Sequence, residues 1–107
     1  LAWLPSLSWR LDKHWSRMRD ETPHLRRPPS EYIRDHVWLT TQPMEEPEKR
    51  KHFHDIVEWI GIDRLLFATD YPHWDFDDPL WAVPVKLDEA ARQALFLDNA
   101  KALYGRA

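Results

Sequence analysis

The residues best placed to do chemistry are Asp70 and His73, which follow a short apolar run in the second half of the 107-residue chain. The run Leu65–Ala68 contains no polar residue, which is typical of a strand buried on both faces in a parallel sheet. Because Pro72 has no amide hydrogen to continue a ladder, the predicted strand ends beside Asp70. Ligands of α/β folds gather at the carboxyl ends of the strands, so Asp70 is a candidate metal ligand or general base. The alternative is that Asp70 only caps a turn or pairs with a basic residue.

A second pair of histidines, His52 and His54, has the His-x-His spacing of some metal sites. Both fall inside a predicted helix, where residues two positions apart point about 200° away from each other. We therefore expect these two imidazoles to lie in solvent rather than to share a metal ion.

An acidic cluster of Asp75, Asp77 and Asp78 follows the candidate site. Carboxylate oxygens are the ligands that calcium prefers, but the spacing matches no calcium loop. The sequence instead favours a helix cap ahead of the proline that comes next.

The elements that must position Asp70 are a strand, a helix and a second strand. Residues His36–Thr41 are β-branched and aromatic, as expected of a strand. Residues Glu48–Ile60 carry apolar side chains at helical spacing, and Gly61 is placed to end that helix. With Leu65–Ala68 this order predicts a parallel βαβ unit. Alternation along the last strand places Phe67 toward the helices and Asp70 toward the interior.

Helices and loops are also predicted at both ends. Residues 1–10 read as a loop that holds Trp3 and Trp9, and a helix is expected over Leu11–Asp20. A proline-rich connection follows, in which Ser30 is expected to cap a short turn. In the C-terminal part we expect a helix from the cap residue Asp88 to Leu97, and a last helix over Asn99–Tyr104 that stops at Gly105. Trp74 and Trp81 fall in a predicted loop, so they would border a pocket or a subunit contact, as would the two N-terminal tryptophans.

Composition narrows the class of protein. Fifteen basic residues against eighteen acidic residues give a net charge of −3, which argues against nucleic acid as a partner. The chain has no cysteine, which suits a reducing compartment, and we expect a cytoplasmic protein. No stretch approaches the ~20 apolar residues of a membrane span, so no membrane partner is expected. The length suits one domain, residues 1–107, and the start at Leu1 suggests the interior of a longer chain.

Several short strings together resemble a known family. They are Trp3-Leu4-Pro5, Trp9–Asp12, Pro29–Tyr32, Phe67–His73 and Asn99–Tyr104, in this order. The set resembles the C-terminal end of the amidohydrolase-related metal-dependent hydrolases, in the branch that contains aminocarboxymuconate-semialdehyde decarboxylase and related aromatic-acid decarboxylases. The resemblance covers essentially the whole chain.

The resemblance implies an α/β fold, the C-terminal portion of a (β/α)₈ TIM barrel, with strands seven and eight in this chain. Asp70 matches the family's aspartate at the end of strand eight, which binds the metal and orients or deprotonates the metal-bound water. Arg10 lies where decarboxylases of this branch place a substrate-contacting arginine, sometimes from a neighbouring subunit. His73 is a further candidate for substrate contact, with no role assigned by motif.

The resemblance also implies a divalent metal, with zinc expected, and a small-molecule substrate. The family's other metal ligands, a His-x-His on the first strand and histidines on strands five and six, lie outside these residues. The parent reaction would be hydrolysis of a C–N or C–O bond, or decarboxylation of a small carboxylic acid. We expect the 107-residue segment alone to be inactive and to hold no metal, because one carboxylate cannot form a catalytic site.

Two further expectations concern assembly. A homo-oligomer is expected, since two adjacent strands leave two unpaired edges and unpaired edges recruit partners. The competing hypothesis is a non-catalytic remnant of a barrel that acts as a structural or interaction segment.

Overall fold

The computed structural model describes residues 1–105, which divide into two compact units. One unit comprises residues 2–37, and the other comprises Leu1 together with the chain from Trp38 onward. Over residues 1–105, every helix is too short or too polar to cross a membrane.

The unit of residues 2–37 contains α1 (Trp3–Arg17), the 3₁₀ turn η1 (Arg19–Glu21) and α2 (Pro29–His36). The prediction of a loop over residues 1–10 was wrong, because α1 begins at Trp3 rather than at Leu11. Pro5 permits this start, since it lies in the first helical turn, where the backbone amides have no partner within the helix. Trp3 and Trp9 are therefore exposed helix residues, not loop residues.

The start of α2 also differs from the prediction. Pro28 is the cap residue and Pro29 occupies the first helical position, so Ser30 lies inside the helix and does not cap it. The backbone amide of Ser30 donates instead to the Asp12 carboxylate at 2.9 Å. An acidic side chain from α1 thus satisfies one of the free amides at the start of α2.

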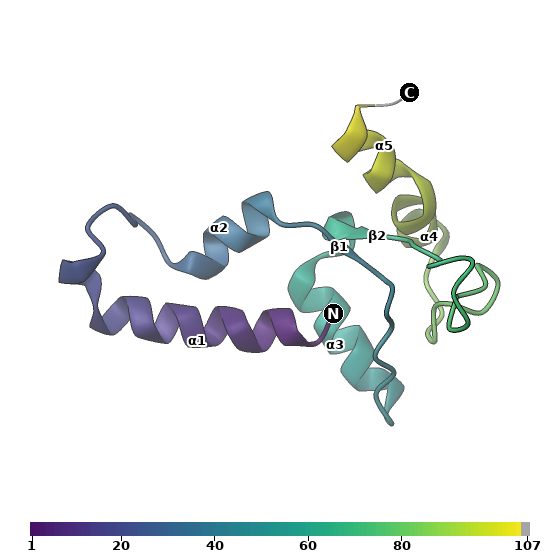
Figure 1. Cartoon of the computed structure of the whole chain (residues 1–107), viewed down its shortest axis with the longest axis horizontal. Coiled ribbons are helices and arrows are strands. Elements are labelled where there is room, and N and C mark those ends of the chain that lie inside the picture. The colour runs from purple at the N-terminus through teal and green to yellow at the C-terminus, as the bar shows by residue number, and fades with distance from the viewer. Residues whose placement is uncertain (106–107) are drawn as a thin grey trace. The chain divides into compact units, whose positions relative to one another are not determined.

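The second unit contains the predicted strand–helix–strand order. Its elements are β1 (Leu39–Thr40), α3 (Arg50–Ile60), the 3₁₀ turn η2 (Ile62–Arg64) and β2 (Leu65–Leu66). The two strands pair in parallel, with Leu39 opposite Leu65 and Thr40 opposite Leu66 (Figure 1). The predicted parallel pairing across an intervening helix is confirmed. Gly61 ends α3 with a φ of 92°, as expected of a glycine there.

Both strands are shorter than predicted. His36 belongs to α2 and not to a strand. Val37 and Trp38 have no strand partner within residues 1–105, because the residues before Leu65 form η2. At the other end, the backbone amide of Phe67 donates to the carbonyl of Leu95 at 3.1 Å rather than to a neighbouring strand. The predicted strand Leu65–Ala68 is therefore paired in the ladder only over its first half.

The C-terminal helices are α4 (Glu89–Gln93), the π-helical segment η3 (Ala94–Asp98) and α5 (Asn99–Tyr104). Asp88 is confirmed as the cap, since its carboxylate accepts from the amide of Ala91 at 2.7 Å. The end of α5 at Gly105, with a φ of 65°, is also confirmed. The predicted break between Leu97 and Asn99 was wrong, because η3 keeps the chain helical from Glu89 to Tyr104.

The core of the second unit lies between the strand pair and these helices. Its buried side chains include Phe53 and Ile60 of α3, Leu65 and Leu66 of β2, and Leu95 of η3. The ring of Phe67 stacks on that of Phe96 with centroids 4.5 Å apart. The prediction that Phe67 faces the helices is therefore confirmed.

Candidate functional site

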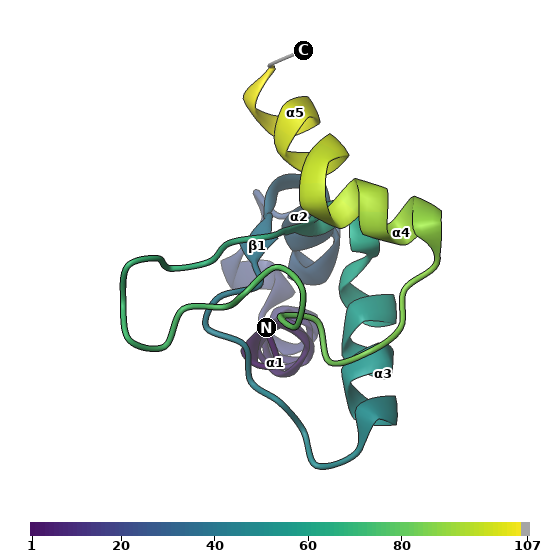
Figure 2. The same cartoon turned by 90° about the vertical axis from the view of Figure 1, so that its right-hand side faces the viewer.

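The candidate site lies on the connection between β2 and α4, which contains no helix or strand. Figure 2 shows this connection as a long green trace that leads into α4. Asp70 comes four residues after the end of β2 and has a φ of 59°, in the left-handed region that aspartate tolerates better than most residues. Its carbonyl accepts a hydrogen bond from the backbone amide of His73 at 2.9 Å. This turn returns the chain so that His73 lies beside Asp70.

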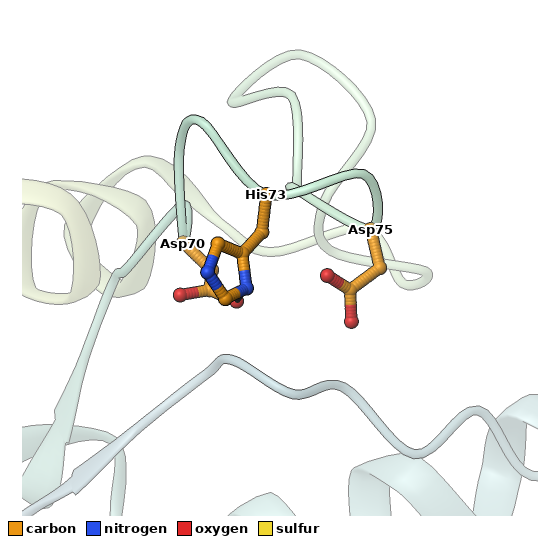
Figure 3. A group of neighbouring side chains, drawn as sticks. All are labelled: Asp70, His73 and Asp75. Carbon is orange, nitrogen blue, oxygen red and sulfur yellow. Dashed lines mark ion pairs between the residues drawn. The ribbon is translucent and has the colours of Figure 1, made fainter.

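Three side chains of this connection lie together. The Nδ1 atom of His73 is 3.3 Å from Oδ2 of Asp70. With Asp75 they offer one imidazole nitrogen and two carboxylate oxygens, all within 4.8 Å of one another. Figure 3 shows the three side chains on the same side of the loop. All three residues are exposed, so an ion or a substrate could reach them.

Backbone and side-chain contacts hold the loop in this shape. The side-chain amide of Gln42, just after β1, donates to the carbonyl of Asp75 at 2.8 Å. The amide of Asp77 donates to the carbonyl of Thr69 at 2.8 Å, and the amide of Tyr71 donates to the Thr69 hydroxyl at 3.2 Å. The connection after β1 and the connection after β2 therefore meet at the carboxyl ends of two paired parallel strands, where α/β folds place their ligands.

The loop is acidic, and one of its carboxylates is partly shielded from water. One carboxylate oxygen of Asp77 is buried and has no hydrogen-bond partner among the described residues. Burial raises the pKa of the Asp77 carboxyl, and the nearby carboxylates of Glu46 and Asp75 raise it further. The site thus gathers negative charge that a cation would neutralise.

The connection that carries the donor cluster also holds aromatic side chains that extend into solvent. Tyr71 is 76% exposed, Trp74 is 94% exposed and Trp81 is 81% exposed. The prediction that Trp74 and Trp81 lie in a loop is confirmed. Tyr71 meets Phe76 edge to face, with ring centroids 5.9 Å apart. This much exposed aromatic surface on one connection is typical of a binding site or an interface.

The cluster fits a divalent metal in both chemistry and spacing. Imidazole and carboxylate are ordinary zinc ligands, and ligand atoms about 2.1 Å from zinc in a tetrahedron lie about 3.4 Å apart. The 3.3 Å between His73 and Asp70 matches that spacing. The three donor atoms all lie within 4.8 Å of one another, which brings one ion within reach of all three groups.

Sequence reasoning found two members of the cluster and missed the third. It treated Asp75 as part of a cap for a helix, but no helix forms there. Asp78 accepts instead from the amide of Leu80 at 2.8 Å within a turn. The spacing Asp-x-x-His-x-Asp from Asp70 to Asp75 was the available signal. A tight turn at Asp70 is needed to bring such residues together, and a turn there was only the alternative to a functional role for Asp70.

The other sequence-predicted residues lie apart from the cluster in the chain. Arg10 is exposed on α1, in the unit that does not carry Asp70, and its substrate role stays a prediction. His52 and His54 are both exposed on α3, as expected of solvated helix residues.

Comparisons with known proteins show which proteins the chain is similar to. A sequence model of the amidohydrolase family matches residues 2–106. The chain is similar to gamma-resorcylate decarboxylases from Polaromonas sp. (strain JS666 / ATCC BAA-500), Rhizobium sp. (strain MTP-10005) and Rhizobium radiobacter. Each is 29% identical over 104 residues, which cover 94% of this chain and 31% of the relative. The chain therefore spans about a third of the length of these curated relatives.

Proposed function

Because the chain belongs to the amidohydrolase family, we propose that its residues form the C-terminal part of a metal-dependent (β/α)₈ enzyme and supply strands seven and eight. The parallel pairing of β1 and β2 across α3 supports this assignment. The 31% coverage of the relatives supports it as well, since two strands with their helices are about that share of a barrel.

We propose that the full-length protein decarboxylates a small carboxylic acid, or hydrolyses a C–N or C–O bond in one. The names of the three relatives favour decarboxylation. The observation that carries the proposal is the position of Asp70, a carboxylate beyond the carboxyl end of β2 with His73 at 3.3 Å. In barrel enzymes, this is the end at which catalytic residues lie.

The metal would be held by Asp70, with His73 and Asp75 within reach and the remaining ligands supplied by strands outside this chain. Zinc is the ion that we propose, and when bound it would polarise a water molecule or a substrate oxygen. Asp70 would bind the ion through one carboxylate oxygen and hold a proton on the other. Arg10 would bind the substrate carboxylate through its guanidinium group, which matches carboxylate geometry.

We also propose that the protein is a homo-oligomer. Exposed aromatic residues of the 71–81 loop, such as Trp74 at 94% exposure, offer apolar surface that a second copy would cover. Light scattering on the full-length protein should give a mass of two or more chains. A monomeric mass would contradict the proposal.

The DNA upstream of Leu1 tests whether the remaining ligands exist. The proposal expects an open reading frame that continues into a His-x-His strand. A start codon with a ribosome-binding site immediately upstream would favour the non-catalytic remnant.

Turnover tests the activity itself. The full-length protein should release carbon dioxide from gamma-resorcylate or a related small aromatic acid, lose this activity with a chelator and regain it with added zinc. Activity that survives complete removal of metal would contradict the proposed metal dependence.

A further inference from the structure

We infer that Thr41 is a positioning residue for Asp70, and that its hydroxyl fixes the backbone from which the metal-binding carboxylate projects. The inference rests on the proposed function, because it assigns Asp70 to the metal. It goes beyond that function by naming a residue just after the neighbouring strand that the site needs.

Thr41 is the residue just after β1, and it is only 1% exposed. Its backbone amide donates to the carbonyl of Leu66 at 2.9 Å, which extends the parallel pairing by one bond. Its hydroxyl accepts from the backbone amide of Ala68 at 3.1 Å, and it lies within donating distance of the Ala68 carbonyl at 3.4 Å. A single buried side chain thus holds both polar groups of Ala68.

The register shows what this hydroxyl replaces. With Leu39 opposite Leu65, a regular parallel ladder would bring the amide of Ala68 to the main-chain carbonyl of Thr41. The amide reaches the Thr41 hydroxyl instead. A side chain therefore accepts the last hydrogen bond between the two strands. The backbone after Ala68 need not continue in the direction of the strand.

The backbone must leave the strand direction after Ala68 because the turn at Asp70 begins two residues later. Asp70 has a φ of 59°, which a regular strand cannot accommodate, and its carbonyl accepts from His73 in the turn that builds the donor cluster. The Thr41 hydroxyl satisfies the final strand amide while it leaves Asp70 free to turn. Outer groups of this kind orient metal ligands without touching the metal.

The chain offers a conservative variant and a matched control. Thr41→Val has the same shape without the hydroxyl, whereas Thr41→Ser keeps the hydroxyl. Thr40→Val removes a neighbouring hydroxyl, one that is exposed and donates to the carbonyl of Gln42 at 3.1 Å. Thr41→Ala serves in place of Thr41→Val if the valine variant is insoluble.

The test is the affinity of the full-length metal-free protein for Co²⁺, followed by visible absorption, together with the position of the cobalt bands. Thr41→Val should weaken Co²⁺ binding by about tenfold or more and shift the bands, the scale of loss typical of an outer group that orients a ligand. Thr41→Ser should restore the bands and the affinity, and Thr40→Val should match the wild type.

Two results would overturn the inference: Co²⁺ binding by Thr41→Val equal to that of the wild type, or a serine variant as weak as the valine variant. Asp70→Asn, measured alongside, separates this failure from that of the proposed function. If Asp70→Asn loses Co²⁺ and Thr41→Val does not, only the role of Thr41 falls. If Asp70→Asn binds Co²⁺ as the wild type does, the proposed function fails, and the role of Thr41 fails with it.

Discussion

The side-chain amide of Asn99 donates a hydrogen bond to the main-chain carbonyl of Leu65 at 2.7 Å, across 34 residues of sequence. The same amide donates to the carbonyl of Ile62 at 2.7 Å. Asn99 is buried at the first position of α5, so both hydrogens of its amide are used in a site with little access to water. One side chain therefore ties the C-terminal helix to the start of the strand that leads to Asp70.

Replacing Asn99 by aspartate should destabilise the folded protein strongly. Asn99→Asp keeps the size of the side chain but places a carboxylate, which cannot donate, against two carbonyl oxygens. We expect a loss of about 2–4 kcal/mol in the free energy of unfolding, measured by urea denaturation. The control is Asp98→Asn at the exposed neighbouring position, which should change stability by less than about 0.5 kcal/mol. Equal stability of the two variants would show that the Asn99 bonds contribute nothing.

The stability of the metal-free protein should depend on the ionisation of Asp77. Burial raises the pKa of Asp77 in the folded state, so the folded protein binds this proton more tightly than the unfolded chain does. The contribution of Asp77 to stability therefore falls as the pH rises from about 4 through the folded-state pKa. Asp77→Asn should raise the melting temperature at pH 7 in the presence of a chelator.

Comparing the melting temperatures of the wild type and Asp77→Asn at low pH checks that ionisation of Asp77 is the cause. As the pH falls below about 4, wild-type Asp77 becomes protonated in both states, so the advantage of Asp77→Asn should shrink. Asp20→Asn, at an exposed position in the other unit, is the control. An advantage of Asp77→Asn that stays constant from pH 3 to pH 7 would contradict this explanation.

Local patterns predicted the elements whose signals lie within a few residues. The apolar stripe that includes Phe53 and Ile60 identified α3, and Asp88 and Gly105 marked the two ends of the C-terminal helical region. Prediction failed where a distant partner decides the outcome. Strand length is one case. β2 ends because the next two backbone amides, those of Phe67 and Ala68, donate to the Leu95 carbonyl and the Thr41 hydroxyl.

In the candidate site, too, local signals were predicted from the sequence and features that depend on distant residues were not. Asp70 and His73 were found because a carboxylate after a buried strand is informative in itself. Asp75 was missed because its position depends on the backbone conformation of Asp70. No sequence pattern predicted the φ of 59° at Asp70. The chain aligns with only 31% of the length of its relatives, so any further ligands of the proposed site would lie outside it.

The isolated 107-residue chain should not retain zinc. The sequence alone offered one ligand, and the structure adds two donors, but all three residues are exposed. A stable zinc site needs ligands that are held in place by a surrounding shell of hydrogen-bond partners. Elemental analysis after dialysis should find well under one zinc per chain, and no turnover should be detected. About one tightly held zinc per chain would contradict this prediction.

Asp70→Asn in the full-length protein tests whether Asp70 binds the catalytic metal. The change is nearly isosteric, so the melting curve should stay as in the wild type, while bound zinc falls and turnover drops by about 100-fold or more. Asp55→Asn, which removes an exposed carboxylate paired with Lys51 on α3, should leave zinc content and turnover unchanged. Near-normal turnover and full zinc content in Asp70→Asn would contradict metal binding by Asp70.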